Sequence, residues 1–212
     1  MRWEILKLLR AQSPAYLSGE AMAARFQVSR TAVWKNVQAL QAAGYQIEGS
    51  TRLGYRLLGS PDFLYPVEID PGPAARIIAV APQLIHHYPQ VDSTNSILKK
   101  MAGKGAPAGT VVVAEEQTGG RGRLGRSWHS PAGKGIWLSI LFRPVLAPSQ
   151  APLFTLLAAG AVATAVKAHL PALAPGIKWP NDLLLAGRKV CGILTEMKAE
   201  ADRLHYLLTG IG

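Results

Sequence analysis

The sequence contains a single cysteine, Cys191. One thiol excludes a framework of intramolecular disulfides, and such scarcity is typical of proteins in a reducing cytosol. The first ten residues, MRWEILKLLR, carry charges every few positions. They therefore lack the apolar core of a secretory signal, and we expect a cytoplasmic protein.

Long hydrophobic runs are also missing. The most apolar stretch, residues 152–166, is shorter than the roughly 20 residues that cross a bilayer. Its many small side chains predict instead a helix that is buried on all sides in a globular core, and we expect no membrane role.

Acidic residues are few, with 13 Asp and Glu against 23 Lys and Arg, so that the net charge is +10. Residues 1–66 carry eight basic and four acidic residues, and residues 67–212 carry fifteen and nine, which gives +4 and +6. An excess in both parts suits a DNA-binding module joined to a domain that handles nucleotide phosphates, although it also suits simple solubility. A hydrophobic content of 49% indicates a globular chain.

The first 66 residues have the pattern of a winged helix-turn-helix. After a first helix, Ser18 and Ser29 are placed to cap helices that end near Phe26 and Ala43, and Gly44 follows the second. Only three residues join these two helices, as in a helix-turn-helix. Alternating apolar residues on both sides of a turn at residues 49–54 predict the wing.

This motif inserts the start of its second helix into the major groove of DNA. The predicted base contacts are therefore Arg30, Thr31, Trp34 and Lys35, and the predicted phosphate contacts on the wing are Arg52 and Arg56. Two alternatives are open: the module binds another protein, or Trp34 packs inward. Prolines at positions 61, 66, 71 and 73 predict a linker, and we place the domain boundary near residue 66.

A loop of alternating glycines and arginines is the most informative segment of the remaining chain. Gly120, Gly122 and Gly125 alternate with Arg121, Arg123 and Arg126. Glycine allows close approach of the backbone and arginine offers a fork of donors, which together suit a carboxylate or a phosphate. No Gly-Lys-Ser/Thr ending follows, so this is not a Walker loop. A solvated loop that contacts RNA is the alternative.

Three more blocks accompany this loop: DSTN at residues 92–95, KWPND at 178–182 and GRKVCGIL at 187–194. Taken alone, DSTN is a good helix cap. Strand alternation places Lys189 on the same face as Cys191 and Ile193. A lysine among apolar strand residues often prevents an exposed edge strand from pairing with another chain. Cys191 itself is expected to be buried, since no His/Cys spacing resembles a zinc site.

The order of these blocks resembles that of biotin protein ligases, and the winged-helix segment extends the resemblance to the bifunctional bacterial form that also represses the biotin operon. The resemblance covers essentially the whole chain. It implies an α/β (α+β) fold, with a winged helix-turn-helix at residues 1–66 and a class II synthetase-like catalytic domain, a mixed sheet backed by helices, at 67–212. It also implies a small C-terminal β-barrel, which we expect to be absent here. Because the sheet would then end abruptly at its last strand, we expect an exposed edge there.

The resemblance assigns site residues position by position. It places biotin and its adenylate against Ser93, Thr94, Asn95, Gln117, Gly120, Arg121, Gly122, Arg123, Lys189, Gly192 and Leu194. Arg121 and Arg123 would neutralise the biotin carboxylate and the α-phosphate. Trp128 either covers the ligand or belongs to the core. Asp182 is expected either to hold Mg²⁺ or to orient the incoming lysine, and with Arg121, Arg123 and Lys189 it completes the catalytic set.

The implied reaction uses ATP to activate biotin as biotinyl-5′-AMP and then transfers biotin to a lysine of a biotin carboxyl carrier protein. The adenylate would also act as corepressor on operator DNA, and a homodimer is the further partner that the resemblance suggests. Two other functions are compatible with the sequence. One is a lipoate or octanoyl ligase-type acyltransferase, and the other is a non-catalytic, biotin-sensing DNA-binding regulator.

Overall fold

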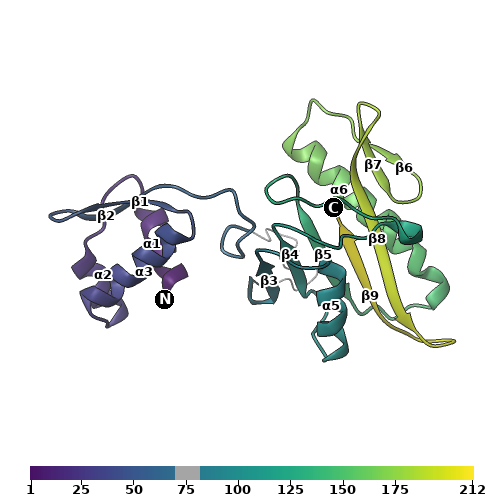
Figure 1. Ribbon diagram of the computed structural model, residues 1–212, viewed down its shortest axis with the longest axis horizontal. Coiled ribbons are helices and arrows are strands. Elements are labelled where there is room, and N and C mark those ends of the chain that lie inside the picture. Colours follow the sequence, from purple (N-terminus) through teal and green to yellow (C-terminus); the bar gives the residue numbers. More distant parts are fainter. Residues whose placement is uncertain (70–81) are drawn as a thin grey trace. The chain divides into compact units, whose positions relative to one another are not determined.

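The computed structural model describes residues 1–69 and 82–212, so Pro71 and Pro73 of the predicted linker lie outside the described residues. The chain separates into two compact units, Met1–Asp62 and Phe63–Gly212. Figure 1 traces their elements along the chain. The domain boundary at residue 66 stays a prediction.

The first unit contains three helices, α1 (Arg2–Gln12), α2 (Gly19–Phe26) and α3 (Arg30–Ala42), and a hairpin of β1 (Gln46–Ser50) and β2 (Gly54–Gly59). The hydroxyls of Ser18 and Ser29 accept hydrogen bonds from the amides of Ala21 and Ala32, both at 3.1 Å, which confirms the two predicted caps. Gly44 follows α3 with a φ of 94°, a conformation that glycine adopts freely. The winged helix-turn-helix is therefore confirmed.

The second unit is built on a seven-stranded sheet with the order β3-β4-β5-β9-β8-β7-β6. Its strands are β3 (Ile85–Tyr88), β4 (Val111–Ala114), β5 (Trp137–Phe142), β6 (Gly176–Lys178), β7 (Asp182–Leu185), β8 (Arg188–Ala199) and β9 (Leu204–Ile211). Short 3-10 turns lie at Pro82–Leu84, Arg123–Gly125 and Pro148–Gln150. Among the strands that the structure describes, only β3 and β4 pair in parallel, so the sheet is mixed.

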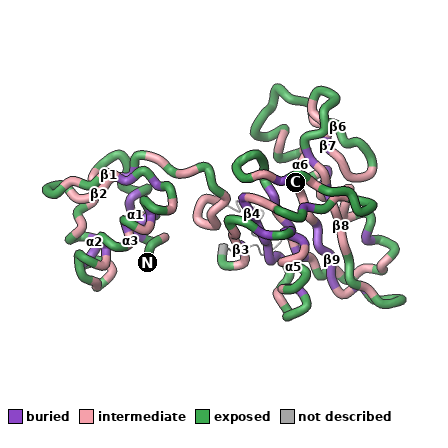
Figure 2. Tube along the Cα trace, in the orientation of Figure 1, coloured by how far each residue is buried: buried purple, intermediate pink, exposed green. Residues whose placement is uncertain are grey.

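The last strand does not form an edge, and that prediction was wrong. Strand β9 pairs with β5 on one side and with β8 on the other, so its backbone groups are satisfied within the sheet. Strands β9 and β4 are the most buried strands of the described sheet (Figure 2). The edges of the described sheet are β3 and β6.

Two helices cover opposite faces of the sheet. Helix α5 (Thr94–Gly103) packs Leu98 against Leu141 and Leu208, whereas α6 (Ala151–His169) packs Ala159 against Ile193. Neighbouring strand residues point to opposite faces. Accordingly Leu207, next to Leu208, lies in the cluster at the start of α6.

Helix α6 is not buried on all sides, contrary to the prediction. Only Ala151 and Ala159 are buried, while Leu153 and Leu157 are 55% and 65% exposed. The helix covers one face of the sheet, and within the described chain nothing packs on its outer side. Its content of small apolar residues therefore did not predict how much of the helix is buried. By length and composition alone, Pro148–His169 could also cross a membrane, a test that core helices of soluble proteins pass as well.

Candidate functional site

The DSTN block forms the start of α5 and is buried in the second unit. Ser93, Thr94 and Asn95 are each less than 5% exposed. Ser93 occupies the position before the helix, but its side chain makes no capping hydrogen bond. Simple helix capping therefore does not account for this block, whose residues line a hollow in the second unit.

A chain of hydrogen bonds links the start of α5 to the entrance of the glycine–arginine loop. The side-chain oxygen of Gln117 accepts from the amide of Thr94 at 2.9 Å, and its nitrogen donates to the hydroxyl of Ser130 at 2.9 Å. The hydroxyl of Ser139 lies 2.8 Å from that of Thr94 and also contacts the amide oxygen of Asn95. We call the group formed by Ser93, Thr94, Asn95, Gln117 and Ser139 the polar wall. These bonds fix its conformation before any ligand is present.

Sequence reasoning missed Ser130, Ser139 and Glu196, which complete this network. Ser139 is fully buried between Trp137 and Leu141 on the inward side of β5. A lone polar residue at an inward position of an apolar strand was the available signal, because a buried hydroxyl needs a partner.

The glycine–arginine loop folds as a tight hairpin in which Arg121 bridges to Ser127 and the amide of Gly122 donates to the carbonyl of Arg126 at 2.7 Å. A Cβ on Gly120 would lie 2.3 Å from the carbonyl oxygen of Trp128, so only glycine fits there. The Arg121 guanidinium lies 3.4 Å from Glu196, and that of Arg123 donates to the side chain of Asn181 at 3.0 Å.

The β7–β8 hairpin contributes the lysine and the carboxylate. The ammonium of Lys189 lies 2.8 Å from Oδ1 of Asp182 and 4.9 Å from the ring centre of Trp128. Asp182 Oδ1 is nevertheless buried without a hydrogen bond of good geometry. The side chain of Lys189 thus points toward Asp182 and Trp128, and it does not serve to block pairing at a sheet edge.

The predicted face of Lys189 was wrong. Leu183 pairs with Cys191, but Leu184 pairs with Lys189, so Val190 is an extra residue in β8. Such a bulge breaks strict alternation. Cys191 and Ile193 join the core beneath α6, whereas Lys189 lies on the opposite side of the sheet with Asp182 and Gly192.

Two adjoining hollows mark the site. An inner hollow of about 30 Å³ is lined by the polar wall, with Ser93, Thr94, Asn95, Gln117, Gly210 and Gly212. A loop hollow of about 260 Å³ is lined by Gly122, Arg123, Asn181, Asp182, Lys189 and Leu194. Trp128 and Gly192 line both, so the indole stands between them.

The position of Trp128 is intermediate between a cover and a core residue. It is half-buried, and its indole nitrogen is buried without a partner. A Cβ on Gly192 would lie 2.9 Å from the ring, and one on Gly212 would lie 2.6 Å from its nitrogen. The indole therefore packs against bare backbone at the mouth of the inner hollow.

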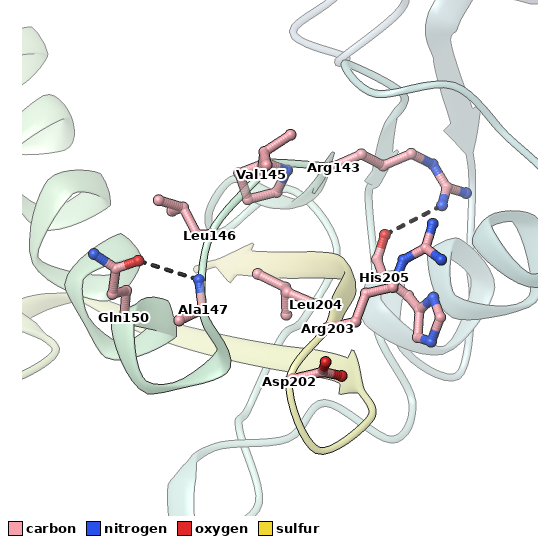
Figure 3. Close-up of a pocket in the computed structure, with 10 residues that line it drawn as sticks. Arg143, Val145, Leu146, Ala147, Gln150, Asp202, Arg203, Leu204 and His205 are labelled. Carbon is pink, nitrogen blue, oxygen red and sulfur yellow. Dashed lines mark hydrogen bonds between the residues drawn. The ribbon is translucent and has the colours of Figure 1, made fainter.

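A larger hollow, about 710 Å³, lies elsewhere in the second unit (Figure 3). Arg143 lines it, but its guanidinium donates to the carbonyls of Ala102, Ala106 and His205 and so supports the end of α5. None of the predicted site residues reaches this hollow. Size alone therefore does not identify the functional site.

The buried thiol and the distribution of His, Cys, Asp and Glu side chains restrict the chemistry of the site. Burial raises the pKa of the Cys191 thiol, which makes it a poor nucleophile and a core residue, as predicted. Within residues 1–69 and 82–212, no group of three or more His, Cys, Asp or Glu side chains could hold a metal ion by itself.

In the first unit, α3 presents the predicted base-reading residues on one surface. Arg30, Thr31, Trp34 and Lys35 are all exposed, opposite the buried Val33, Val37 and Leu40. Trp34 is 50% exposed, so the alternative of inward packing is wrong.

The two wing arginines differ in their surroundings. Arg52 is exposed in the turn, whereas the guanidinium of Arg56 donates to Glu48 and lies 4.7 Å from the ring centre of Tyr16. The Tyr16 hydroxyl also donates to Glu48, at 2.7 Å. Hydrogen bonds from Tyr16 and Arg56 lower the pKa of the Glu48 carboxyl, and the bond to Glu48 raises the pKa of Tyr16.

Comparisons with known proteins agree with this arrangement. The model of the biotin/lipoate A/B protein ligase family matches residues 88–212, and a helix-turn-helix domain model matches residues 2–56. The bifunctional ligase/repressor BirA of Bacillus spizizenii is 40% identical over 212 residues, 100% of this chain and 64% of that protein. The biotin–[acetyl-CoA-carboxylase] ligase of Mycobacterium tuberculosis is 46% identical over 127 residues, 58% of this chain and 46% of that protein.

Among solved structures, the biotin protein ligase from Leishmania major in complex with biotin superimposes with a TM-score of 0.52 at 33% identity. The match covers 62% of this chain and 56% of that one. The chain thus spans less than two thirds of the length of each of these relatives.

Proposed function

Because the chain belongs to the biotin/lipoate A/B protein ligase family, we propose that it is an ATP-dependent, cytoplasmic biotin protein ligase with a DNA-binding repressor unit. The observation that carries the proposal is the order of groups along the site. A buried polar wall is followed by an indole and then by two cations, Arg123 and Lys189. That order suits a ligand with a hydrogen-bonding ring at one end and a carboxylate at the other.

The ring of biotin would bind in the inner hollow. Ser93, Thr94 and Asn95 supply hydroxyl and amide groups that can pair the donors and acceptors of its ureido group, which must be satisfied when buried. A space of about 30 Å³ does not admit a bicyclic ring, so Trp128 would move outward and then cover the ligand.

In the first step, a carboxylate oxygen of biotin forms a bond to the α-phosphorus of ATP, and pyrophosphate leaves. Two anions must meet, and their repulsion opposes the reaction. Arg123 and Lys189 line the loop hollow, whereas the guanidinium of Arg121 lies against Ser96 and Glu196 outside both hollows. All three cations would neutralise the two anions once Arg121 turns from Glu196 toward the ligand. Asp182 would hold the Lys189 ammonium in place at 2.8 Å.

Asp182 is also the residue that fits Mg²⁺. Its Oδ1 faces the Lys189 ammonium at 2.8 Å, but a carboxylate has several lone pairs, so one is left for a metal ion. Mg²⁺ commonly takes only one or two protein carboxylates and completes its shell with water and substrate phosphates. When bound, the ion would supply further neutralisation of the phosphate charge. The same carboxylate could instead orient the incoming lysine.

In the second step, the amine of a lysine on a biotin carboxyl carrier protein attacks the carbonyl carbon of the mixed anhydride. An amide forms, the amine loses a proton, and AMP leaves. No residue of this chain becomes covalently modified, so its contribution is position and charge.

The first unit would place Arg30, Thr31, Trp34 and Lys35 in the major groove of operator DNA, with Arg52 and Arg56 at the phosphates. Biotinyl-5′-AMP would act as corepressor. Proteins of this class read symmetric operators as dimers, so we expect a homodimer on DNA.

Biotin-dependent exchange between pyrophosphate and ATP tests the first step, with lipoate as the matched competitor. Biotin-dependent exchange, with none from lipoate, is the expected result. Labelling of a carrier domain, detected with streptavidin, tests the second step. Binding of biotin without exchange would contradict the ligase proposal and favour a sensor, and exchange driven by lipoate would contradict the choice of substrate.

DNA binding needs a separate assay. Duplexes selected from a random pool should bind more tightly when biotinyl-5′-AMP is present. Equal binding with and without the adenylate would contradict its role as corepressor, while leaving the ligase proposal intact.

A further inference from the structure

Glu196 lies on β8 outside all of the sequence motifs, yet it contacts two residues of the site. Its Oε2 accepts from the side-chain nitrogen of Asn95 at 2.7 Å and lies 3.4 Å from the guanidinium of Arg121. Asn95 belongs to α5 and Arg121 to the glycine–arginine loop. One carboxylate oxygen therefore joins the polar wall to the loop.

The first consequence concerns the orientation of the Asn95 amide. A carboxylate only accepts hydrogen bonds, so the NH₂ group of Asn95 must point toward Glu196. The carbonyl of Leu194 lies 3.4 Å from the same nitrogen, and Ser139 contacts the amide oxygen. With its N–H groups directed away, Asn95 offers the inner hollow an acceptor and no donor.

That polarity bears on the choice of ligand. A ring that carries an N–H, as a urea does, can pair with the Asn95 oxygen. A ring without an N–H, such as a dithiolane, leaves the Ser139 hydroxyl as the partner of this oxygen and cannot add a hydrogen bond to it. Sites built around a hydrogen bond discriminate strongly against analogues that lack the partner group.

The second consequence concerns the loop. Arg121 is 46% and Glu196 28% exposed, and their charges are 3.4 Å apart, so this ion pair is weak. The hydroxyl of Ser96 gives Arg121 a second partner at 3.3 Å. The pair is strong enough to favour one loop position and weak enough for an incoming anion to displace it.

We propose that Glu196 is a positioning residue that fixes Asn95 as an acceptor for a ligand N–H and holds the loop through Arg121 until an anion arrives. The specificity part rests on the proposed function, whereas the loop part concerns the free protein. Glu196 does not touch the reacting atoms in this scheme.

Two variants separate the parts. Glu196→Gln keeps an oxygen for Asn95 but loses the charge that attracts Arg121, and Glu196→Ala loses both. The control is Glu200→Gln, since Glu200 is 73% exposed beyond the end of the same strand. Melting temperatures of all four proteins show whether each is folded, and Glu196→Gln carries the test if the alanine variant is not.

Limited trypsin digestion without ligand measures how readily the loop opens, because Arg121, Arg123 and Arg126 are exposed cleavage sites. Loss of a weak ion pair should speed cleavage in the loop roughly three-fold in Glu196→Gln and leave the control unchanged. Cleavage at the wild-type rate in both Glu196 variants would overturn the loop part, whether or not the protein binds biotin.

Calorimetry with biotin and lipoate, together with exchange kinetics, measures the contribution of the polar wall to ligand affinity and preference. An unpaired buried amide should raise the Kd and KM for biotin at least about ten-fold in Glu196→Ala, with kcat for exchange less affected and preference over lipoate reduced. If the wild type binds biotin and Glu196→Ala retains its KM and preference, the specificity part is refuted while the ligase proposal stands. If the wild type shows no exchange and no biotin binding, both fall, and the digestion result alone decides the role of Glu196 in the loop.

Discussion

Replacement of Gly210 by alanine should damage the site through one methyl group. Gly210 lies on β9 opposite Ser139 and Leu194. A Cβ built there would lie 2.7 Å from the amide oxygen of Asn95 and 3.2 Å from its nitrogen. The backbone of Gly210 is not in the left-handed region, so the effect of the substitution is steric.

Asn95 has little freedom to avoid this methyl group. It is 4% exposed, and Ser139, Leu194 and Glu196 hold its amide. A shifted amide would weaken buried hydrogen bonds, which cost about 1–3 kcal/mol each when a partner is left unsatisfied. The alanine regains about 0.4–1 kcal/mol because it restricts the unfolded chain. The net loss of stability should be about 1–3 kcal/mol, in the usual range for overpacking.

Thermal unfolding and calorimetry measure the outcome. For a unit of this size, about 2–4 °C is lost per kcal/mol, so the melting temperature should fall by roughly 3–10 °C. Biotin affinity should fall with it, since Asn95 lines the inner hollow. Gly160→Ala is the control, because a Cβ there meets nothing within 4 Å and alanine is the better helix former. Wild-type stability and biotin affinity in Gly210→Ala would refute the rigidity that we assign to Asn95.

Three further predictions follow from the site, the wing and the thiol. Lys189→Met keeps a side chain against Trp128 but removes the ammonium, so pyrophosphate exchange should fall about 100-fold while the exposed Lys198→Met exchanges normally; equal rates would exclude a role for the charge. In the wing, the lowered pKa of Glu48 stabilises the folded state at pH values above its ordinary pKa of 4.5, and this stability is lost as the pH falls through the lowered pKa. The raised pKa of Tyr16 stabilises the folded state at pH values below its ordinary pKa of 10.0, and this stability is lost as the pH rises through the raised pKa. Thermal melts of Glu48→Gln should therefore lack the acid-side part of this dependence, and a pH profile identical to that of the wild type would contradict it. Because burial raises the pKa of Cys191, iodoacetamide at neutral pH should modify it at least about ten-fold more slowly than the same thiol in guanidinium, and equal rates would contradict its burial.

Local patterns in the sequence were enough to predict the first unit. Ser18, Ser29 and Gly44 act within a few residues of their own position, so their capping roles follow from chemistry that needs no tertiary context. The exposed surface of α3 likewise follows from helical spacing of its apolar residues.

The features that sequence reasoning missed depend on distant pairing. Ser139 and Glu196 are single polar residues in strands, and their partner Asn95 lies 44 and 101 residues away. The central place of β9 is set by strand pairing that no local pattern encodes. The exposed side of α6 has the same origin, since composition does not reveal how many faces of a helix are covered.

The bulge at Val190 is coupled to the length of the turn in the β7–β8 hairpin. Deletion of Val190 would restore regular pairing and still leave Lys189 opposite Leu184, on the ligand side. If Arg188 joined Ala186 and Gly187 in a three-residue turn, β8 would pair regularly in the other way, with Lys189 opposite Leu185 on the side of Cys191. The length of the turn, more than the residue at position 190, therefore determines on which side of the sheet the charge of Lys189 lies.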